Sequence, residues 1–82
     1  MISVKITVML KPGVLDPQGK TVRNALESLG FKGLVDLRIG KFMELKMDGL
    51  SPEKAREQVE EMCNKLLANP VTEDYRFEIE SV

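Results

Sequence analysis

The chain has 82 residues and a formal net charge of −1, with 43% of its residues hydrophobic and 30% charged. This length and balance are typical of one soluble globular domain covering residues 1–82. They exclude binding of nucleic acid through a globally basic surface, and no apolar stretch reaches the ~20 residues of a membrane span. The first residues lack a signal-peptide pattern, and one cysteine, Cys63, cannot form an internal disulfide. We therefore expect a cytoplasmic protein.

Residues 2–10 predict a strand, because β-branched and aliphatic residues alternate with other residues there. Lys11 to Gly13 end it. A helix follows, with Asp16 as its N-cap, Pro17 in its first position and Gly30 closing it. Its apolar stripe consists of Val22, Ala25, Leu26 and Leu29.

The middle of the chain predicts a β-hairpin. Residues 35–39 and 43–47 each place aliphatic or methionine side chains at every second position. Gly40 and Lys41 lie between them and are expected to form the turn, although Gly-Lys is a weaker turn signal than Asn-Gly. Asp48 and Gly49 end the second strand.

The longest predicted helix covers residues 52–68, with Ser51 as its cap and Asn69 and Pro70 ending it. Its predicted apolar stripe is Ala55, Val59, Met62 and Leu66, widened by Cys63 and Leu67. A final strand runs through residues 75–80. The order β-α-β-β-α-β predicts an α+β fold in which two helices cover one face of a mainly antiparallel four-stranded sheet, a ferredoxin-like arrangement.

The other face of this sheet is predicted to be open and mostly polar. Met9, Leu34 and Phe42 are the apolar residues expected there, either as ordinary surface residues or as part of a contact with another chain. The remaining residues expected on it are Lys5, Thr7, Asp36, Arg38, Glu44, Lys46, Arg76 and Glu78.

The residues offer little catalytic chemistry. The absence of histidine excludes Ser-His-Asp triads, Cys-His dyads and histidine metal sites. Cys63 is expected to be a small buried hydrophobic residue, and the six glycines form no phosphate-binding fingerprint. Residues 11–19 offer a lysine and backbone amides to an anion, although a turn followed by a helix cap is the commoner explanation. An acylphosphatase-like site lacks its loop arginine, and an RNA-recognition site lacks an aromatic residue in the first strand.

Three stretches resemble a known family. They are residues 10–19 (LKPGVLDPQG), 36–41 (DLRIGK) and 66–75 (LLANPVTEDY). In this order and with this chain length, they resemble the PurS subunits of phosphoribosylformylglycinamidine (FGAM) synthase across essentially the whole chain. Thr72 is a small departure, since an aliphatic residue is expected there.

The resemblance implies a non-catalytic subunit of an ATP-dependent ligase in purine biosynthesis. The complex converts formylglycinamide ribonucleotide (FGAR), glutamine and ATP into FGAM, glutamate, ADP and phosphate. A glutaminase subunit (PurQ) releases ammonia, and a synthetase subunit (PurL) uses ATP and Mg²⁺, so this chain itself needs no cofactor or metal. The family also implies a homodimer, with a tetramer left open, and contacts with PurL and PurQ but with neither nucleic acid nor membrane.

Subunit contacts are expected in the stretches that carry the resemblance. Caps and turns explain several of their residues, but Lys11, Arg38, Lys41 and Tyr75 have weaker structural explanations. The expected contact residues are Lys11, Asp16, Gln18, Arg38, Lys41, Phe42, Asn69, Glu73 and Tyr75. The alternative is a regulatory domain similar to ACT domains, which share this element order and would bind an amino acid at a dimer interface.

Overall fold

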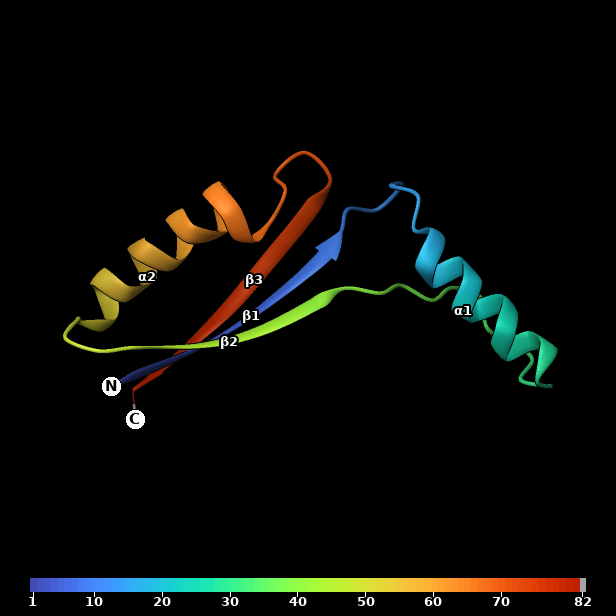
Figure 1. The fold of residues 1–82 in the computed structure, drawn as a ribbon, viewed down its shortest axis with the longest axis horizontal. Coiled ribbons are helices and arrows are strands. Elements are labelled where there is room, and N and C mark those ends of the chain that lie inside the picture. Colours follow the sequence, from blue (N-terminus) through green and yellow to red (C-terminus); the bar gives the residue numbers. More distant parts are fainter. Residues whose placement is uncertain (82) are drawn as a thin grey trace.

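The structure, a computed structural model, describes residues 1–81 and contains within them a three-stranded antiparallel sheet with a helix packed on one face (Figure 1). The sheet order is β2-β1-β3, so β1 lies in the centre with both neighbours antiparallel to it. The strands are β1 (Ile2–Leu10), β2 (Lys41–Met47) and β3 (Glu73–Ser81). The helices are α1 (Pro17–Ser28) and α2 (Pro52–Met62), the latter continued by a π-helical turn, η1 (Cys63–Leu67).

The core lies between β1 and α2. Period-2 alternation places the even-numbered residues of β1 on one face, and four of them, Ile2, Val4, Ile6 and Val8, are almost fully buried. From α2 and η1, Ala55, Val59 and Cys63 meet them and have no exposed surface. The predicted first strand is therefore confirmed, and so is the burial of Cys63.

Helix α2 begins as predicted and ends differently. The hydroxyl of Ser51 accepts a hydrogen bond from the N–H of Lys54 at 3.3 Å, which makes Ser51 the N-cap. At the other end, Ala68 N–H donates to the carbonyl of Cys63 at 2.9 Å, which is a π-type bond. The wider turn directs Ala68 into the core and leaves Leu66 83% exposed, so the prediction that Leu66 belongs to the buried stripe was wrong.

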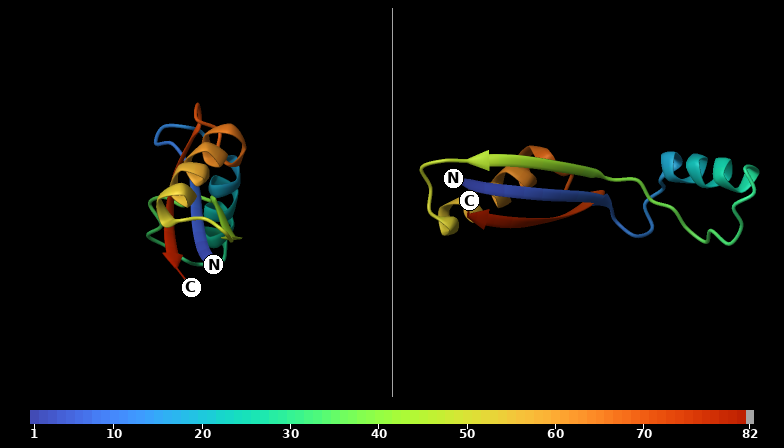
Figure 2. Two further views of the ribbon diagram at one scale, coloured as in Figure 1. Left: turned by 90° about the vertical axis from the view of Figure 1, so that its left-hand side faces the viewer. Right: turned by 90° about the horizontal axis from the view of Figure 1, so that it is seen from below.

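Helix α1 lies beyond the end of the sheet and covers neither of its faces (Figures 1 and 2). We call residues 11–40, which contain α1, the arm. The radius of gyration is 16.4 Å, with extents of 50 × 27 × 15 Å, whereas a compact chain of this length has a radius of about 12 Å. The predicted cap, Asp16, and the positive φ of Gly30 are both confirmed. The prediction that two helices cover one face of the sheet was wrong for the single chain.

The predicted hairpin at Gly40 was also wrong. Residues 34–40, the last part of the arm, run directly into β2 and add no strand beside it (Figure 1); we call them the return segment. Gly40 lacks the positive φ that a two-residue hairpin turn requires. A Cβ atom on Gly40 would collide with the carbonyl oxygen of Val8, so glycine at this position lets the chain pass close to β1 without turning. The described sheet consequently has three strands where four were predicted.

Val59 and Val71 give a matched test of the core, since one is fully buried and the other is 80% exposed. Val59→Ala is expected to lower the free energy of unfolding by about 2 kcal/mol, because two buried methyl groups are lost and a cavity remains. Val71→Ala is expected to change it by less than about 0.5 kcal/mol. Urea denaturation monitored by circular dichroism measures both, and equal losses would contradict this assignment of the core.

Candidate functional site

Two ion pairs gather charged side chains at the end of the sheet where β1 stops and β2 and β3 begin. The ammonium of Lys11 lies 3.2 Å from a carboxylate oxygen of Asp74, and that of Lys41 lies 3.7 Å from Glu73. We call this place, with Asn69 at the turn before β3, the junction. It brings together segments that are more than 60 residues apart in the sequence, and the arm leaves from it.

Glu73 holds the junction together. Its side chain is only 18% exposed, and one carboxylate oxygen accepts the N–H of Asn69 at 2.7 Å while the other faces Lys41. The Asn69 carbonyl accepts the N–H of Glu73 at 2.7 Å, and the Asn69 side chain accepts the N–H of Val71 at 3.0 Å. The turn before β3 is therefore fixed from both ends by side-chain and backbone bonds.

Tyr75 borders a cavity of about 310 Å³ beside the junction. Its ring stacks on that of Phe77, with centroids 6.3 Å apart. Cys63 lies in the cavity wall, and burial, followed by the charge of Glu60, raises the pKa of its thiol. A buried and protonated thiol is a poor nucleophile, so Cys63 acts here as a packing residue. The remaining lining residues are Lys11, Asn64, Ala68, Pro70, Glu73 and Asp74.

Asp16 connects α1 to the return segment. One carboxylate oxygen accepts the N–H of Gly19 at 2.9 Å, and the other accepts the N–H of Ile39 at 3.0 Å. These bonds lower the pKa of Asp16 below its ordinary value of 3.8, with Gly19 contributing most. Farther along α1, Arg23 Nε donates to the carbonyl of Leu34 at 2.7 Å, so α1 is tied to the return segment at both ends of that segment.

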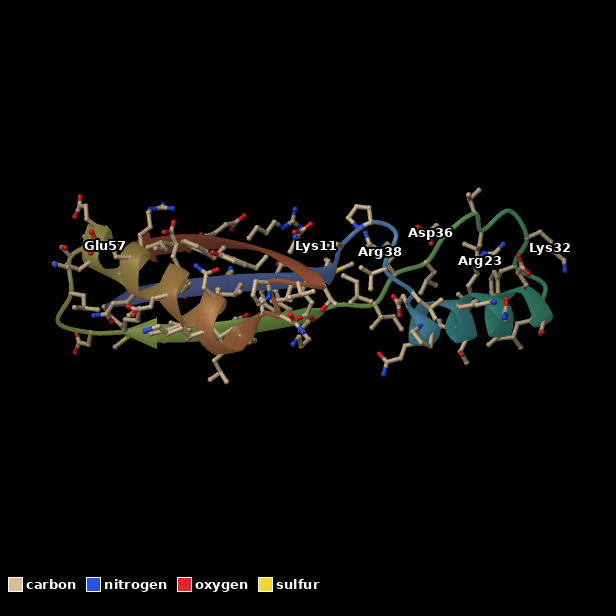
Figure 3. The ribbon with its side chains drawn as sticks, turned by 90° about the horizontal axis from the view of Figure 1, so that it is seen from above. Lys11, Arg23, Lys32, Asp36, Arg38 and Glu57 are labelled. Atoms are coloured by element: carbon tan, nitrogen blue, oxygen red, sulfur yellow. The ribbon has the colours of Figure 1, made fainter. Side chains whose placement is uncertain are left out.

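The other predicted contact residues lie in three different places. Gln18 lines a cavity of about 260 Å³ together with Asp16, Lys41 and Glu73, which places it next to the junction. Arg38 is exposed on the return segment, near Asp36 and Arg23, and Lys11 lies at the end of the sheet (Figure 3). Phe42 is separate from both, because it is 59% exposed on the open face of the sheet.

The open face is polar as predicted, although three residues expected on it, Leu34, Asp36 and Arg38, lie on the return segment outside the sheet. Phe42 borders a hollow there with Lys5, Thr7, Arg76 and Glu78. In the strand register, Lys5 lies between Glu44 and Glu78. Charges of alternating sign on a sheet face favour solubility and specific contacts more than a buried hydrophobic interface.

The arrangement suits binding better than reaction chemistry. The ammonium groups of Lys11 and Lys41 pair with carboxylates, and the N–H of Gly19 donates to Asp16. The groups that could have donated to an anion at residues 11–19 are therefore already paired within the chain. Within residues 1–81, no three Cys, Asp or Glu side chains lie close enough together to hold a metal ion. In the same residues, no helix is long and apolar enough to cross a membrane.

Two structurally important residues, Gly19 and Arg23, were missed by sequence reasoning. Gly19 is buried, and a Cβ atom there would collide with the carbonyl oxygen of Leu37, so glycine lets α1 lie directly on the return segment. A glycine inside the first turn of a helix costs up to about 1 kcal/mol of helix stability relative to alanine. Its presence there could have indicated that another segment packs closely against the helix. The long-range bond of Arg23 has no local sequence signal.

Comparison with known proteins gives a consistent result. The family model described as "PurS: Phosphoribosylformylglycinamidine (FGAM) synthase" matches residues 3–81. The PurS subunit of phosphoribosylformylglycinamidine synthase from Bacillus subtilis is 51% identical over 82 residues, covering 100% of this chain and 96% of that protein. The B. subtilis PurS structure in its C2 crystal form superposes with a TM-score of 0.89 at 51% identity, covering 99% of this chain and 100% of that one.

A third relative belongs to a larger assembly. A chain in the structure of PurLQS from Thermotoga maritima superposes with a TM-score of 0.85 at 35% identity, and 96% of each chain is covered.

Glu73 and Asp74 provide a test of the junction, because they are adjacent carboxylates with different burial. Glu73→Ala is expected to lower the free energy of unfolding by about 1 kcal/mol or more, since it leaves Asn69 N–H and Lys41 without their partner. Asp74→Ala breaks an exposed pair and is expected to cost less than about 0.5 kcal/mol. Thermal unfolding measures the difference, and a larger loss for Asp74→Ala would refute the central role of Glu73.

Proposed function

Because the chain belongs to the PurS family of phosphoribosylformylglycinamidine synthase, we propose that it joins the synthetase PurL to the glutaminase PurQ and supports ammonia transfer between them. The chain is a subunit of this enzyme of purine biosynthesis. The observation that carries the docking role is the T. maritima PurLQS assembly, in which a closely similar chain occurs. On this proposal the complex acts in the cytoplasm, and ATP and Mg²⁺ are used by PurL.

A docking role fits the chemistry of the chain. The sequence has no histidine, and its one cysteine is buried with a raised pKa. The charged residues of the junction are engaged in ion pairs that fix turns. The relatives compared above carry the PurS name, and they give no support to the alternative of an amino-acid-binding regulatory domain.

The arm supports a homodimer as part of this proposal. Leu29 is 74% exposed, Phe31 59% and Val35 92%. The helical apolar stripe predicts that Leu29 is buried, and the alternation of residues 35–39 predicts the same for Val35. The accessible surface is 5970 Å², whereas a monomer of this mass has about 4,900 Å². The excess is of the size that one partner buries in a standard interface, about 800 Å².

We propose that the return segment of each copy pairs with the free edge of β2 in the other copy. β2 is an edge strand, so the backbone groups on its outer side lack strand partners within the described sheet. The partner's return segment would supply a fourth strand and its α1 a second helix. The predicted four-stranded sheet with two helices would then be formed by two chains. Each chain of 82 residues would remain a single domain, and the fourth strand and the second helix would come from its partner.

Side-chain parity selects the register of this pairing. A two-fold axis at Lys41 places Ile39 opposite Met43, Leu37 opposite Leu45 and Val35 opposite Met47 of the other copy, all on the α2 side. On the open face it places Arg38 opposite Glu44, and Asp36 opposite Lys46. Moving the axis by one residue to Gly40 would place Asp36 opposite Glu44, and like charges directly opposite are destabilising. The Lys41 side chains would meet at the axis, each held by its own Glu73.

The predicted contact residues take two roles in this proposal. Arg38, Lys41 and Phe42 belong to the centre of the pairing between copies, and Asp16 positions the segment that pairs. The residues beside it form one surface in each copy, on either side of the two-fold axis and available to PurL and PurQ; they are Lys11, Gln18, Asn69, Glu73 and Tyr75.

Reconstitution tests the docking role. Purified PurL and PurQ are mixed with FGAR, glutamine, ATP and Mg²⁺, and FGAM formation is measured with and without this chain. The chain is expected to raise the glutamine-dependent rate at least about tenfold while leaving the rate with added ammonia largely unchanged, because only the former needs transfer between subunits. Equal glutamine-dependent rates with and without the chain would refute the docking role.

Charge reversal tests the dimer register. Asp36→Lys and Lys46→Asp should each weaken dimerisation about tenfold, because every change occurs twice across the axis and one cross-strand charge pair is worth roughly 0.2–1 kcal/mol. The double variant Asp36→Lys/Lys46→Asp should restore it.

The two residues lie ten positions apart in an extended segment, which separates them by about 33 Å, so they cannot pair within one chain. Analytical ultracentrifugation over a dilution series measures the dissociation constants. Additive losses in the double variant would contradict the register.

A further inference from the structure

Asp16 makes a connection that a helix cap does not need. An N-cap side chain accepts one N–H from the first helical turn, and the bond from Gly19 fulfils that role. The second oxygen accepts from Ile39, which is 23 residues away on the return segment. Three contacts along α1 therefore meet backbone groups of that segment: Asp16 at Ile39 N–H, Gly19 at the Leu37 carbonyl, and Arg23 at the Leu34 carbonyl.

The contacts of Asp16 and Gly19 occupy one edge of the return segment, whereas the bond from Arg23 holds its first residue, Leu34. In an extended chain, residues two apart present their N–H and C=O groups on the same side, so Ile39 and Leu37 share an edge. Asp16 and Gly19 lie against that edge. The backbone groups of Asp36 and Arg38 point to the opposite edge, and no hydrogen bond from either backbone to another described element is present.

We propose that Asp16 is the positioning residue that closes one edge of the return segment, so that the arm pairs with a second copy through the other edge alone. An extended segment with both edges open can pair on either side and in shifted registers. With α1 fastened on the Ile39 side, the remaining edge is the one that presents Asp36 and Arg38 to β2 of the other copy. This inference rests on the proposed homodimer and assigns to Asp16 the choice of edge and register.

The lowered pKa of Asp16 agrees with this role. Two backbone N–H groups favour the ionised carboxylate, and the charge of Arg38 adds to them. The carboxylate therefore remains an acceptor at both oxygens at neutral pH.

Two variants separate the cap from the edge contact. Asp16→Asn keeps one side-chain oxygen for Gly19 N–H but replaces the second with an NH₂ group, which cannot accept from Ile39. Asp16→Ser also keeps a good cap and does not reach Ile39. Asp48→Asn serves as the matched control, since Asp48 accepts only the local N–H of Gly49.

Register is read by disulfide trapping. The pair Asp36→Cys/Lys46→Cys lies directly opposite in the proposed register, within the Cα separation that a disulfide spans, whereas Asp36→Cys/Glu44→Cys is displaced by two residues and lies outside it. Cys63 can remain, because it is buried and protonated. With Asp16 intact, the Lys46→Cys pair should form intermolecular disulfide at least about tenfold faster than the Glu44→Cys pair.

Asp16→Asn and Asp16→Ser should each reduce this preference about tenfold, and Asp48→Asn should leave it unchanged. Amide hydrogen exchange should accelerate about tenfold at Ile39 while Gly19 keeps its protection, which shows that the cap survives. An unchanged register preference or an unchanged Ile39 exchange rate in both Asp16 variants would overturn the role of Asp16 and leave the homodimer standing. Absence of the Lys46→Cys disulfide with Asp16 intact would overturn the dimer register and the role of Asp16 together.

Discussion

Strand β1 is the element on which the rest of the structure depends. It pairs on both edges, over seven residues with β2 and nine with β3, and its inner side chains supply half of the buried core. β1 ends at Leu10, and β2 begins at Lys41, opposite the end of β1. The return segment, which precedes Lys41, therefore extends beyond the end of β1 and has no strand beside it. The junction forms at that end. Its ion pairs and the bonds of Glu73 hold the three strand ends together where the hydrophobic core has run out.

Much of the fold could be predicted because it follows from local patterns. Alternation identified β1, the Ser51 cap and Pro52 identified the start of α2, and Asp16 and Gly30 bounded α1. Gly40 misled the prediction, because the same residue type that permits a turn also permits close passage beside a carbonyl. The apolar stripes predicted for α1 and residues 35–39 are not buried in the single chain, where Leu29 is 74% exposed and Val35 92%. What the sequence could not reveal is that the chain itself does not cover them.

The candidate site was predictable in part for a similar reason. Lys11, Lys41, Asn69, Glu73 and Tyr75 were chosen from stretches that resemble the family, and the structure brings them to one end of the sheet. Their pairing depends on strand register, which no local pattern specifies. The second bond of Asp16 depends on a contact across 23 residues, so only its role as a cap was readable. Phe42 was correctly placed on the open face, apart from the others.

The uncovered arm has a consequence for the life of the protein in the cell. The single chain contains its three-stranded sheet, but apolar side chains of α1 and the return segment, such as Leu29 and Val35, are exposed to water. On the proposed pairing, the final step of folding is bimolecular, and its rate rises with the square of the concentration of free chain. A chain left without a copy would present an unpaired strand edge and apolar surface, which are features that quality-control proteases and aggregation both act on. Supply of this subunit would thus set a threshold below which little of the enzyme complex accumulates.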